Sequence, residues 1–329
     1  MTLRTAVIGV GSLGRQHARI HSSLASEGLF QFVSVCDINE NTARAIAAER
    51  EVECTSDWRD LIGQVDAVSL AVPTVSHCEI ACGLLAKGIH VLVEKPISTT
   101  LAEADRMIAA ADKSGALLQV GHLERFNPAL VALRPHVRNP VYFEVHRVGA
   151  FTARSLDIDV VLDLMIHDLD IVQWLVGEHV ELVDLRAVGI PILTDKVDAA
   201  NARLEFASGA VANITASRVG TEKIRKMRFF QPHDYIAIDY VTNHATISNL
   251  APPNAQGAWP GVNTTTLDVQ TVEPLRAEIV AFIEAAGDGL PSPVSGKDGR
   301  NALALALRAL ERIHEHTARS GIRISTTER

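Results

Sequence analysis

The first 122 residues alternate between short apolar segments and helical segments. The apolar segments, such as "AVSLAV", lack the regular polar positions of a strand with one solvated face. We predict strands at Thr5–Val10, Phe30–Asp37, Val65–Pro73, His90–Glu94 and Leu117–Gly121, and helices at Leu13–Ser26, Glu40–Arg50, Val75–Lys87 and Leu101–Ser114. Strands and helices that alternate strictly along the chain build βαβ units, so this order predicts a Rossmann-type, doubly wound parallel sheet.

The pattern changes after Gly121. Segments such as "VYFEVHRV" and "MRFFQPHDYIAIDY" alternate apolar and polar residues, which predicts a mostly antiparallel, open sheet with two different faces. "FASGAV" predicts a hairpin with Gly209 in its turn. Because 329 residues exceed a typical single core, we predict two domains, 1–122 and an α+β domain at 123–329. Its other expected elements are helices at Ala129–Val137, Val160–Val176, Val272–Ala286 and Asp298–Ser320, and a long loop at 249–266 that is mobile or rests on a neighbouring subunit.

Composition narrows the class of protein. The chain carries 31 basic and 39 acidic residues, interspersed, for a net charge of −8. This balance argues against broad nucleic-acid binding but permits a local basic pocket for a phosphate. No apolar run approaches the roughly 20 residues of a membrane helix, and the N-terminus enters a strand without room for a signal peptide. The four cysteines show no metal-ligand spacing, so we expect reduced thiols, no metal and a cytoplasmic protein.

The first turn carries the glycine pattern "GVGSLG", with Gly9, Gly11 and Gly14. This pattern is weak alone, but here it follows a strand and opens a helix. In this context Gly9 permits the tight turn, Gly11 lets a pyrophosphate approach the backbone, and Gly14 lets the helix pack against the sheet. Asp37 ends the next strand, where an acceptor for the adenosine ribose is expected. A simple turn aspartate is the alternative. The pattern predicts dinucleotide binding.

The segment "VLVEKPIST" places Lys95 directly after a buried strand. Ligands of open α/β sheets bind outside the carboxyl ends of the strands, so Lys95 lies on the ligand side. There it could reach a nicotinamide or a substrate hydroxyl. A surface pair of Glu94 and Lys95 is the alternative. Pro96 favours the functional interpretation, because a rigid or cis proline fixes the direction of the lysine.

The expected helix at Val160–Val176 is apolar nearly all round, which indicates burial. Asp163 and His167 lie four residues apart and share one face. A carboxylate beside an imidazole can fix its tautomer and favour its protonation, as a general acid/base requires. The spacing alone also permits a metal pair or a structural hydrogen bond.

Together, "GVGSLGRQH", "AVPTVSH", "GIHVLVEKPIS" and "VLDLMIHDLDI" resemble the glucose–fructose oxidoreductase/inositol dehydrogenase (Gfo/Idh/MocA) family over nearly the whole chain. The resemblance implies an NAD-dependent oxidoreductase, in dimers or tetramers built through the C-terminal sheet, in which Lys95, Asp163 and His167 are catalytic. The family usually has ATP where this chain has AVP, and a glycine pair where this chain has Asp157–Val160. The residues implied to contact the cofactor are Gly9, Gly11, Ser12, Leu13, Gly14, Asp37, Ala71, Val72, Pro73, His77, Glu94, Lys95, His122 and Arg125.

Two further segments, "VGHLERFNPAL" and "RVGAFTARSLDIDVVLDLMIHDLDI", are similar to dehydrogenases that oxidise UDP-N-acetylglucosamine at its 3-hydroxyl in an amino-sugar branch of lipid A synthesis. Arg147 and Arg154 flank the catalytic helix in sequence and could hold a diphosphate. His122 and Arg125 are expected at the cleft between the domains. Solvated surface charges are the alternative for the arginines, and the Lys223–Arg228 run is either a phosphate site or an exposed strand edge. The expected substrate contacts are Lys95, Arg125, Arg147, Arg154, Asp163 and His167.

Other interpretations stay open at this point. A dehydrogenase of a free sugar or inositol needs no arginine pair. A regulator that binds NAD without turnover needs no acid/base group. Asp37 favours NAD over NADP, although Arg44 on the next helix could reach a 2′-phosphate.

Overall fold

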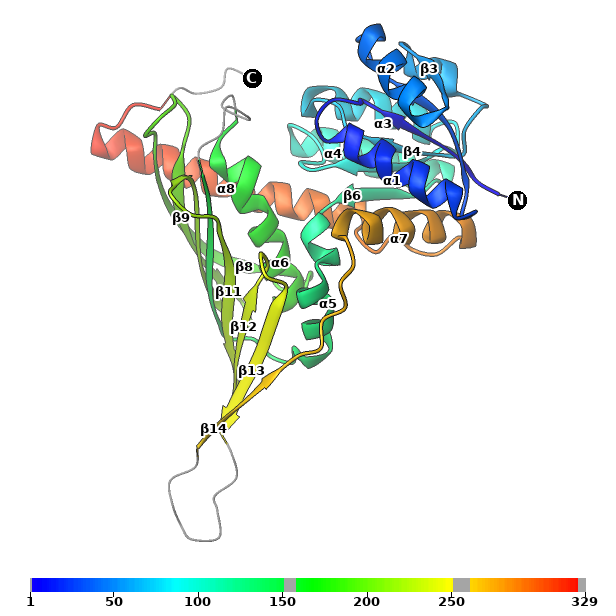
Figure 1. The fold of residues 1–329 in the computed structure, drawn as a ribbon. Coiled ribbons are helices and arrows are strands. Elements are labelled where there is room, and N and C mark those ends of the chain that lie inside the picture. Colours follow the sequence, from blue (N-terminus) through cyan, green and yellow to red (C-terminus); the bar gives the residue numbers. More distant parts are fainter. Residues whose placement is uncertain (1, 151–157, 251–260, 325–329) are drawn as a thin grey trace. The chain divides into compact units, whose positions relative to one another are not determined.

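A computed structural model describes residues 2–150, 158–250 and 261–324, and the chain divides into two compact units (Figure 1). One unit comprises residues 1–123 with Glu273–Leu303, and the other comprises residues 124–272 with 304–329. The segment Glu273–Leu303, which the sequence pattern places in the second domain, therefore packs with the first unit.

The first unit is built on a six-stranded sheet in the order β3-β2-β1-β4-β5-β6, and all of its pairs are parallel. The predicted doubly wound sheet is confirmed. The prediction missed β3, which has only three residues and no apolar run. The strands are β1 Arg4–Ile8, β2 Gln31–Cys36, β3 Glu53–Thr55, β4 Ala67–Leu70, β5 His90–Glu94 and β6 Leu118–Gly121.

Helices flank this sheet. Its core joins α1 to α7 through buried side chains such as Ile20, Phe30, Leu92, Ile279 and Phe282. The C-terminal part of the chain thus completes the hydrophobic core of the first unit. The helices are α1 Gly14–Ser26, α2 Glu40–Arg50, α3 His77–Leu85, α4 Leu101–Ser114, α7 Pro274–Asp288 and the start of α8 Gly296–Ser320, with 3-10 turns at Trp58–Leu61, Thr74–Ser76 and Leu123–Phe126.

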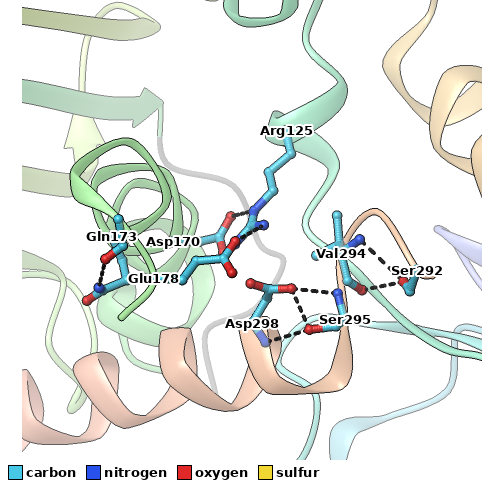
Figure 2. A network of polar contacts seen from close by, with 9 residues as sticks. Arg125, Asp170, Gln173, Glu178, Ser292, Val294, Ser295 and Asp298 are labelled. Atoms are coloured by element: carbon cyan, nitrogen blue, oxygen red, sulfur yellow. Dashed lines mark hydrogen bonds and ion pairs between the residues drawn. The ribbon is translucent and has the colours of Figure 1, made fainter. Parts of the chain in front are cut away.

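Side-chain caps fix where several helices begin. Thr100 and Glu103 form a capping box at α4, in which each side chain satisfies a backbone N–H of the other residue. Ser295 and Asp298 make the same exchange at the start of α8 (Figure 2). These polar residues at fixed spacing explain why sequence patterns predict such starts well.

The second unit is built on an eight-stranded sheet in the order β14-β13-β12-β11-β7-β10-β9-β8. It is mostly antiparallel, as predicted, but β7 and β10 pair in parallel. Gly209, with φ of +84°, lies in the predicted hairpin turn between β9 and β10. The strands are β7 Tyr142–Ala150, β8 Leu182–Ile190, β9 Ala199–Phe206, β10 Val211–Gly220, β11 Ile224–Gln231, β12 Asp234–Asp239, β13 His244–Leu250 and β14 Val262–Thr266.

Two local predictions for this unit are wrong. β14 lies inside the segment predicted as a loop, because its polar residues pair with β13 through backbone hydrogen bonds that need no apolar pattern. Residues 251–260 of that predicted loop lie outside the described residues. The Lys223–Arg228 run is no strand edge either, because β11 lies between β12 and β7.

The helices of the second unit are α5 Pro128–Leu133 with a 3-10 turn at Arg134–His136, α6 Ile166–Val176 and the remainder of α8. A π-helical turn, Val161–Met165, precedes α6 where one regular helix was predicted. Such turns occur often at functional sites. Every helix among the described residues is too short or too polar to cross a bilayer.

Candidate active site

The glycine-rich turn between β1 and α1 is shaped to receive a dinucleotide. Gly9 has φ of +80°, and a Cβ there would lie 2.7 Å from the carbonyl oxygen of Ala71. At Gly14 a Cβ would lie 1.7 Å from the carbonyl oxygen of Gly9, so both positions exclude side chains. At Gly11, by contrast, a Cβ would meet no atom within 4 Å, and Gly11, Ser12 and Leu13 are exposed. A pyrophosphate can therefore approach this backbone beside the N-terminus of α1.

Asp37 directly follows β2 and ties this turn in place. Its Oδ2 accepts a hydrogen bond from the backbone N–H of Val10 at 2.9 Å, and its Oδ1 accepts one from Asn39 at 2.9 Å. A carboxylate keeps further lone pairs, so Asp37 can also accept a ribose hydroxyl. The next residue, Ile38, is 93% exposed, which is unusual for an apolar side chain. We did not predict Ile38 as a site residue, although it can pack against an adenine ring.

Ala71, Val72 and Pro73 follow β4 at the same carboxyl edge of the sheet, and all three have solvent access. His77, another predicted cofactor contact, is 1% exposed and lies inside the protein. Its Nε2 is 2.9 Å from the carbonyl oxygen of Val72, and its Nδ1 is 3.0 Å from that of Pro96. Burial lowers the pKa of His77, so its ring is neutral and carries a single N–H. The ring can therefore donate to only one of these two carbonyl oxygens at a time, and it lies between the segment after β4 and the segment after β5. The structure thus gives His77 a supporting place rather than an open one.

Lys95 directly follows β5, also at the carboxyl edge of the sheet. The peptide bond between Lys95 and Pro96 is cis, which is one of the two proline arrangements considered from the sequence. The neighbouring Glu94 is engaged inside the protein. Its Oε2 accepts the backbone N–H of Lys95 at 3.2 Å, and its Oε1 is 2.9 Å from Nε2 of His17. Burial alone would raise the pKa of Glu94, but His17 and Lys95 outweigh it and lower the pKa, so Glu94 is ionised.

His17 lies in the first turn of α1, is fully buried, and was not predicted as part of the site. The only sequence signal for this role is its position, three residues after Gly14, the last glycine of the glycine-rich turn. Gly121 makes room for this arrangement, because a Cβ there would lie 3.0 Å from Oε2 of Glu94. Nearby His122, a predicted cofactor contact, is 1% exposed at the end of β6.

Asp163 lies in the π-helical turn and His167 in the first turn of α6, and both are half-buried. Their neighbour Asp159 fixes the start of this segment. Its Oδ1 accepts the backbone N–H of Val197 at 2.9 Å, and its carbonyl oxygen accepts that of Asp163 at 3.0 Å. Asp159 therefore supports the helix start in the segment where the family usually has a glycine pair.

Arg147 does not have the open position that diphosphate binding requires. It is 2% exposed. It donates from Nε and Nη2 to both oxygens of Asp168, at 2.7 and 2.9 Å, and from Nη1 to Glu124 at 2.8 Å. Burial alone would lower the pKa of Arg147, but Asp168 and Glu124 raise it, so the guanidinium stays charged. Arg147 thus neutralises two buried carboxylates, and neither of our two interpretations, ligand contact or solvated charge, describes it.

Arg125 is likewise engaged within the second unit (Figure 2). It donates from Nε and Nη2 to Asp170 at 2.9 and 2.7 Å, and its Nη1 lies 3.4 Å from Glu178. Its guanidinium also lies 5.3 Å from the ring centre of Trp174. Such a bidentate, stacked arginine orients the α6 segment. Arg154, the other predicted diphosphate ligand, lies outside the described residues.

Two surface hollows of the described residues lie away from these side chains. The larger, of about 450 Å³, lies at β8, β9 and α8, and the smaller, of about 270 Å³, lies at β11, β12 and the turn after it. None of the predicted catalytic residues lines either one. Within the described ranges, no group of three or more histidine, cysteine, aspartate or glutamate side chains could hold a metal ion.

Each unit carries one part of the predicted chemistry. The first presents the glycine-rich turn, Asp37 and Lys95 at the carboxyl edge of a parallel sheet, where dinucleotides bind. The second presents Asp163 and His167, side chains of the kind that act as general acids and bases. The shape and polarity of the first part fit NAD.

Comparison with known proteins agrees with this geometry. Residues 3–122 match the Gfo/Idh/MocA model described as an oxidoreductase family with an NAD-binding Rossmann fold, and residues 130–230 match a C-terminal domain model of the same family. UDP-N-acetylglucosamine 3-dehydrogenase from Acidithiobacillus ferrooxidans is 39% identical over 93% of this chain and 96% of its own. A solved structure of that enzyme gives a TM-score of 0.88 at 37% identity, covering 96% of this chain and 99% of that one.

A more distant relative is the myo-inositol 2-dehydrogenase of Thermotoga maritima, which is 29% identical over 95% of this chain and 97% of its own. These likenesses extend over both units rather than over the NAD-binding part alone. The chain therefore belongs to the Gfo/Idh/MocA family of NAD-binding oxidoreductases.

Proposed function

We propose that this protein oxidises a sugar hydroxyl to a ketone with NAD, and that its substrate is UDP-N-acetylglucosamine, oxidised at the 3-hydroxyl. The observation that carries the proposal is the likeness over 93% of the chain to an enzyme named for that reaction. The 3-keto sugar is ready for transamination, which places the reaction in an amino-sugar branch such as that of lipid A.

The proposed chemistry divides between named residues. NAD, held at the glycine-rich turn by the backbone at Gly11 and by Asp37, would supply the hydride acceptor for the carbon that carries the hydroxyl. His167 takes the hydroxyl proton as general base, and Asp163 favours the protonated imidazole that results. Lys95 orients and polarises the same oxygen, which becomes the ketone oxygen. Of the two arginines predicted to hold the diphosphate, Arg147 is occupied by carboxylates, and Arg154 remains a candidate on sequence grounds alone.

A defined product tests this proposal. The purified protein is incubated with UDP-N-acetylglucosamine and NAD, with α-ketoglutarate added to recycle any tightly held cofactor. Mass spectrometry should show a sugar nucleotide lighter by two hydrogens, and NMR should place the ketone at carbon 3. Oxidation at another carbon, or of another sugar only, would overturn the substrate assignment.

The second candidate substrate is free inositol, favoured by the relative from Thermotoga maritima. It would need no arginine for a diphosphate. A regulator that binds NAD without turnover is a third candidate, and it would leave the half-buried Asp163 and His167 without a role. Substrate turnover separates these candidates.

We also propose a homodimer or homotetramer assembled through the open face of the eight-stranded sheet. This face carries exposed apolar side chains, including Val188, Ile190 and Phe230, which are 40–45% exposed. Apolar patches of this kind mark protein contacts. We further propose a cytoplasmic location, in keeping with four cysteines that form no disulfide. Light scattering and cell fractionation test these two points.

A further inference from the structure

Arg225 on β11 lies beside Arg147 on β7. The two residues are direct partners in the antiparallel pairing of these strands. Side chains alternate along a strand, so Arg225 shares its sheet face with the buried residues Met227 and Phe229 of the same strand. This is the face that carries Arg147, and Arg147 contacts Asp168 of α6. Arg225 therefore lies on the sheet face that packs against the helix with the predicted acid/base pair.

The N–H groups of the Arg225 guanidinium are not used in hydrogen bonds to the described residues. Its nearest charged partner is Oε1 of Glu124, 3.6 Å from Nη1, and this oxygen already accepts a hydrogen bond from Arg147 at 2.8 Å. Among the residues of the described ranges, none accepts a hydrogen bond from the Arg225 side chain. That side chain is 37% exposed, so a molecule from solvent can reach it. Arg147, by contrast, uses three nitrogens on carboxylates and is buried.

Burial shields part of the Arg225 guanidinium from water. Burial lowers the pKa of Arg225, and the charge of Arg147 lowers it further, against the opposing effects of Glu124, Asp168 and Asp163. The guanidinium is thus less well solvated than an arginine in water, although it remains charged. A half-buried cation with unused donors is suited to a partly buried anionic group.

We propose that Arg225 binds the diphosphate of a nucleotide-sugar substrate and thereby sets the preference for a nucleotide-linked sugar over a free one. The proposal deepens the proposed function and rests on it. Two parallel N–H groups of a guanidinium match two phosphate oxygens, which the point charge of a lysine cannot reproduce. Inositol carries no charge, so it cannot form these charge-assisted hydrogen bonds with Arg225.

Arg228 supplies a matched control, because it is an exposed arginine on the opposite face of the same strand. Calorimetry measures the binding of UDP and of NAD to the wild type, Arg225→Ala, Arg225→Lys and Arg228→Ala, and steady-state kinetics measure the KM for UDP-N-acetylglucosamine. Loss of charge-assisted hydrogen bonds should raise the UDP Kd and the KM about 10- to 100-fold in Arg225→Ala, with a smaller rise in Arg225→Lys. NAD binding should be unchanged in all variants, which also verifies folding, and Arg228→Ala should match the wild type.

A UDP Kd and KM equal to those of the wild type in Arg225→Ala would overturn the assignment, as would equal losses in Arg225→Ala and Arg228→Ala. The UDP measurement separates this inference from the proposed function. If the wild type binds UDP but oxidises no UDP sugar, the proposed reaction fails, whereas the effect of Arg225→Ala on UDP binding still decides the role of Arg225. A wild type that does not bind UDP contradicts both.

Discussion

His17 of α1 and Glu94 of β5 form a buried pair, with Nε2 of the histidine 2.9 Å from Oε1 of the glutamate. The second oxygen of Glu94 accepts the backbone N–H of Lys95. The lysine predicted to touch the substrate is therefore held, through its main chain, by a pair that connects the start of α1 to the end of β5. We propose on this basis that Glu94 positions Lys95, and its predicted contact with the cofactor stays a prediction.

Replacing Glu94 should impair turnover more than cofactor binding. Glu94→Gln removes the charge beside His17 and Lys95 and keeps the size of the side chain. A displacement of about 1 Å at a reacting group can cost on the order of a hundredfold in rate, so kcat should fall by up to that factor. The NAD Kd should change little. The exposed Glu79→Gln is the control, and a Glu94→Gln variant with the kcat of the wild type would show that Lys95 needs no such support.

Glu278 on α7 should destabilise the protein at neutral pH. It is fully buried, and among the described residues neither carboxyl oxygen has a hydrogen-bond partner. Burial, and then the charge of Glu94, raise its pKa well above the ordinary value, so folding takes up a proton. The free energy of unfolding therefore falls by about 1.4 kcal/mol per pH unit above the pKa of the unfolded chain, until the folded pKa is reached.

Glu278→Gln removes this cost and keeps the shape. Urea unfolding should show a variant that is more stable than the wild type at pH 7, with the difference shrinking towards pH 4. The control is Glu284→Gln, at an exposed position of the same helix. A stability difference between Glu278→Gln and the wild type that does not change with pH would contradict a protonated Glu278.

His167→Asn should lose turnover and keep NAD affinity. A positioned general base contributes on the order of a hundred- to ten-thousand-fold, and an amide cannot take the hydroxyl proton. Single-turnover rates measure the chemical step, and calorimetry measures the cofactor. His146→Asn changes an exposed histidine on β7 and should behave like the wild type. Near-normal single-turnover rates in His167→Asn would remove this residue from the mechanism.

Asp37 should make the protein prefer NAD to NADP. Its carboxylate lies beside the glycine-rich turn, where it can accept a ribose hydroxyl and would repel a 2′-phosphate by about 1 to 4 kcal/mol at close range. Arg44, which could offset this effect, donates to Glu40 at 2.7 Å. Asp37→Asn keeps an acceptor but loses the charge, so the ratio of the NADP Kd to the NAD Kd should fall. Equal or tighter binding of NADP by the wild type contradicts the assignment.

The sequence predicts the first unit well because its signals are local. Apolar runs, glycines with steric reasons and capping residues all act within a few positions, as for His90–Glu94 and Leu101–Ser114, which were predicted with their observed bounds. The elements that were missed depend on long-range pairing. β3 has three residues, and β14 is held by its hydrogen bonds to β13.

The same distinction applies to the site. Lys95 and Asp37 directly follow predictable strands, so their places at the carboxyl edge of the sheet followed from the sequence, whereas the pairing of His17 with Glu94 beside Lys95 did not. The partners of Arg147 did not, because Asp168 and Glu124 are about 20 positions away in both directions and meet it only through packing. No periodicity distinguishes an arginine that neutralises buried carboxylates from one that binds a ligand. Arg225 belongs to the Lys223–Arg228 run, for which the sequence left a phosphate site and an exposed strand edge as alternatives, and only the strand pairing shows which sheet face it shares.

The most direct test of the whole account is a comparison of kcat/KM for UDP-N-acetylglucosamine and for free myo-inositol, each with NAD, followed through the absorbance of the reduced nicotinamide. We predict turnover with the UDP sugar at a kcat/KM at least tenfold above that with inositol, since an arginine–phosphate hydrogen bond contributes about 1.5 to 3 kcal/mol. Faster turnover of inositol, or turnover of neither compound, would contradict the account.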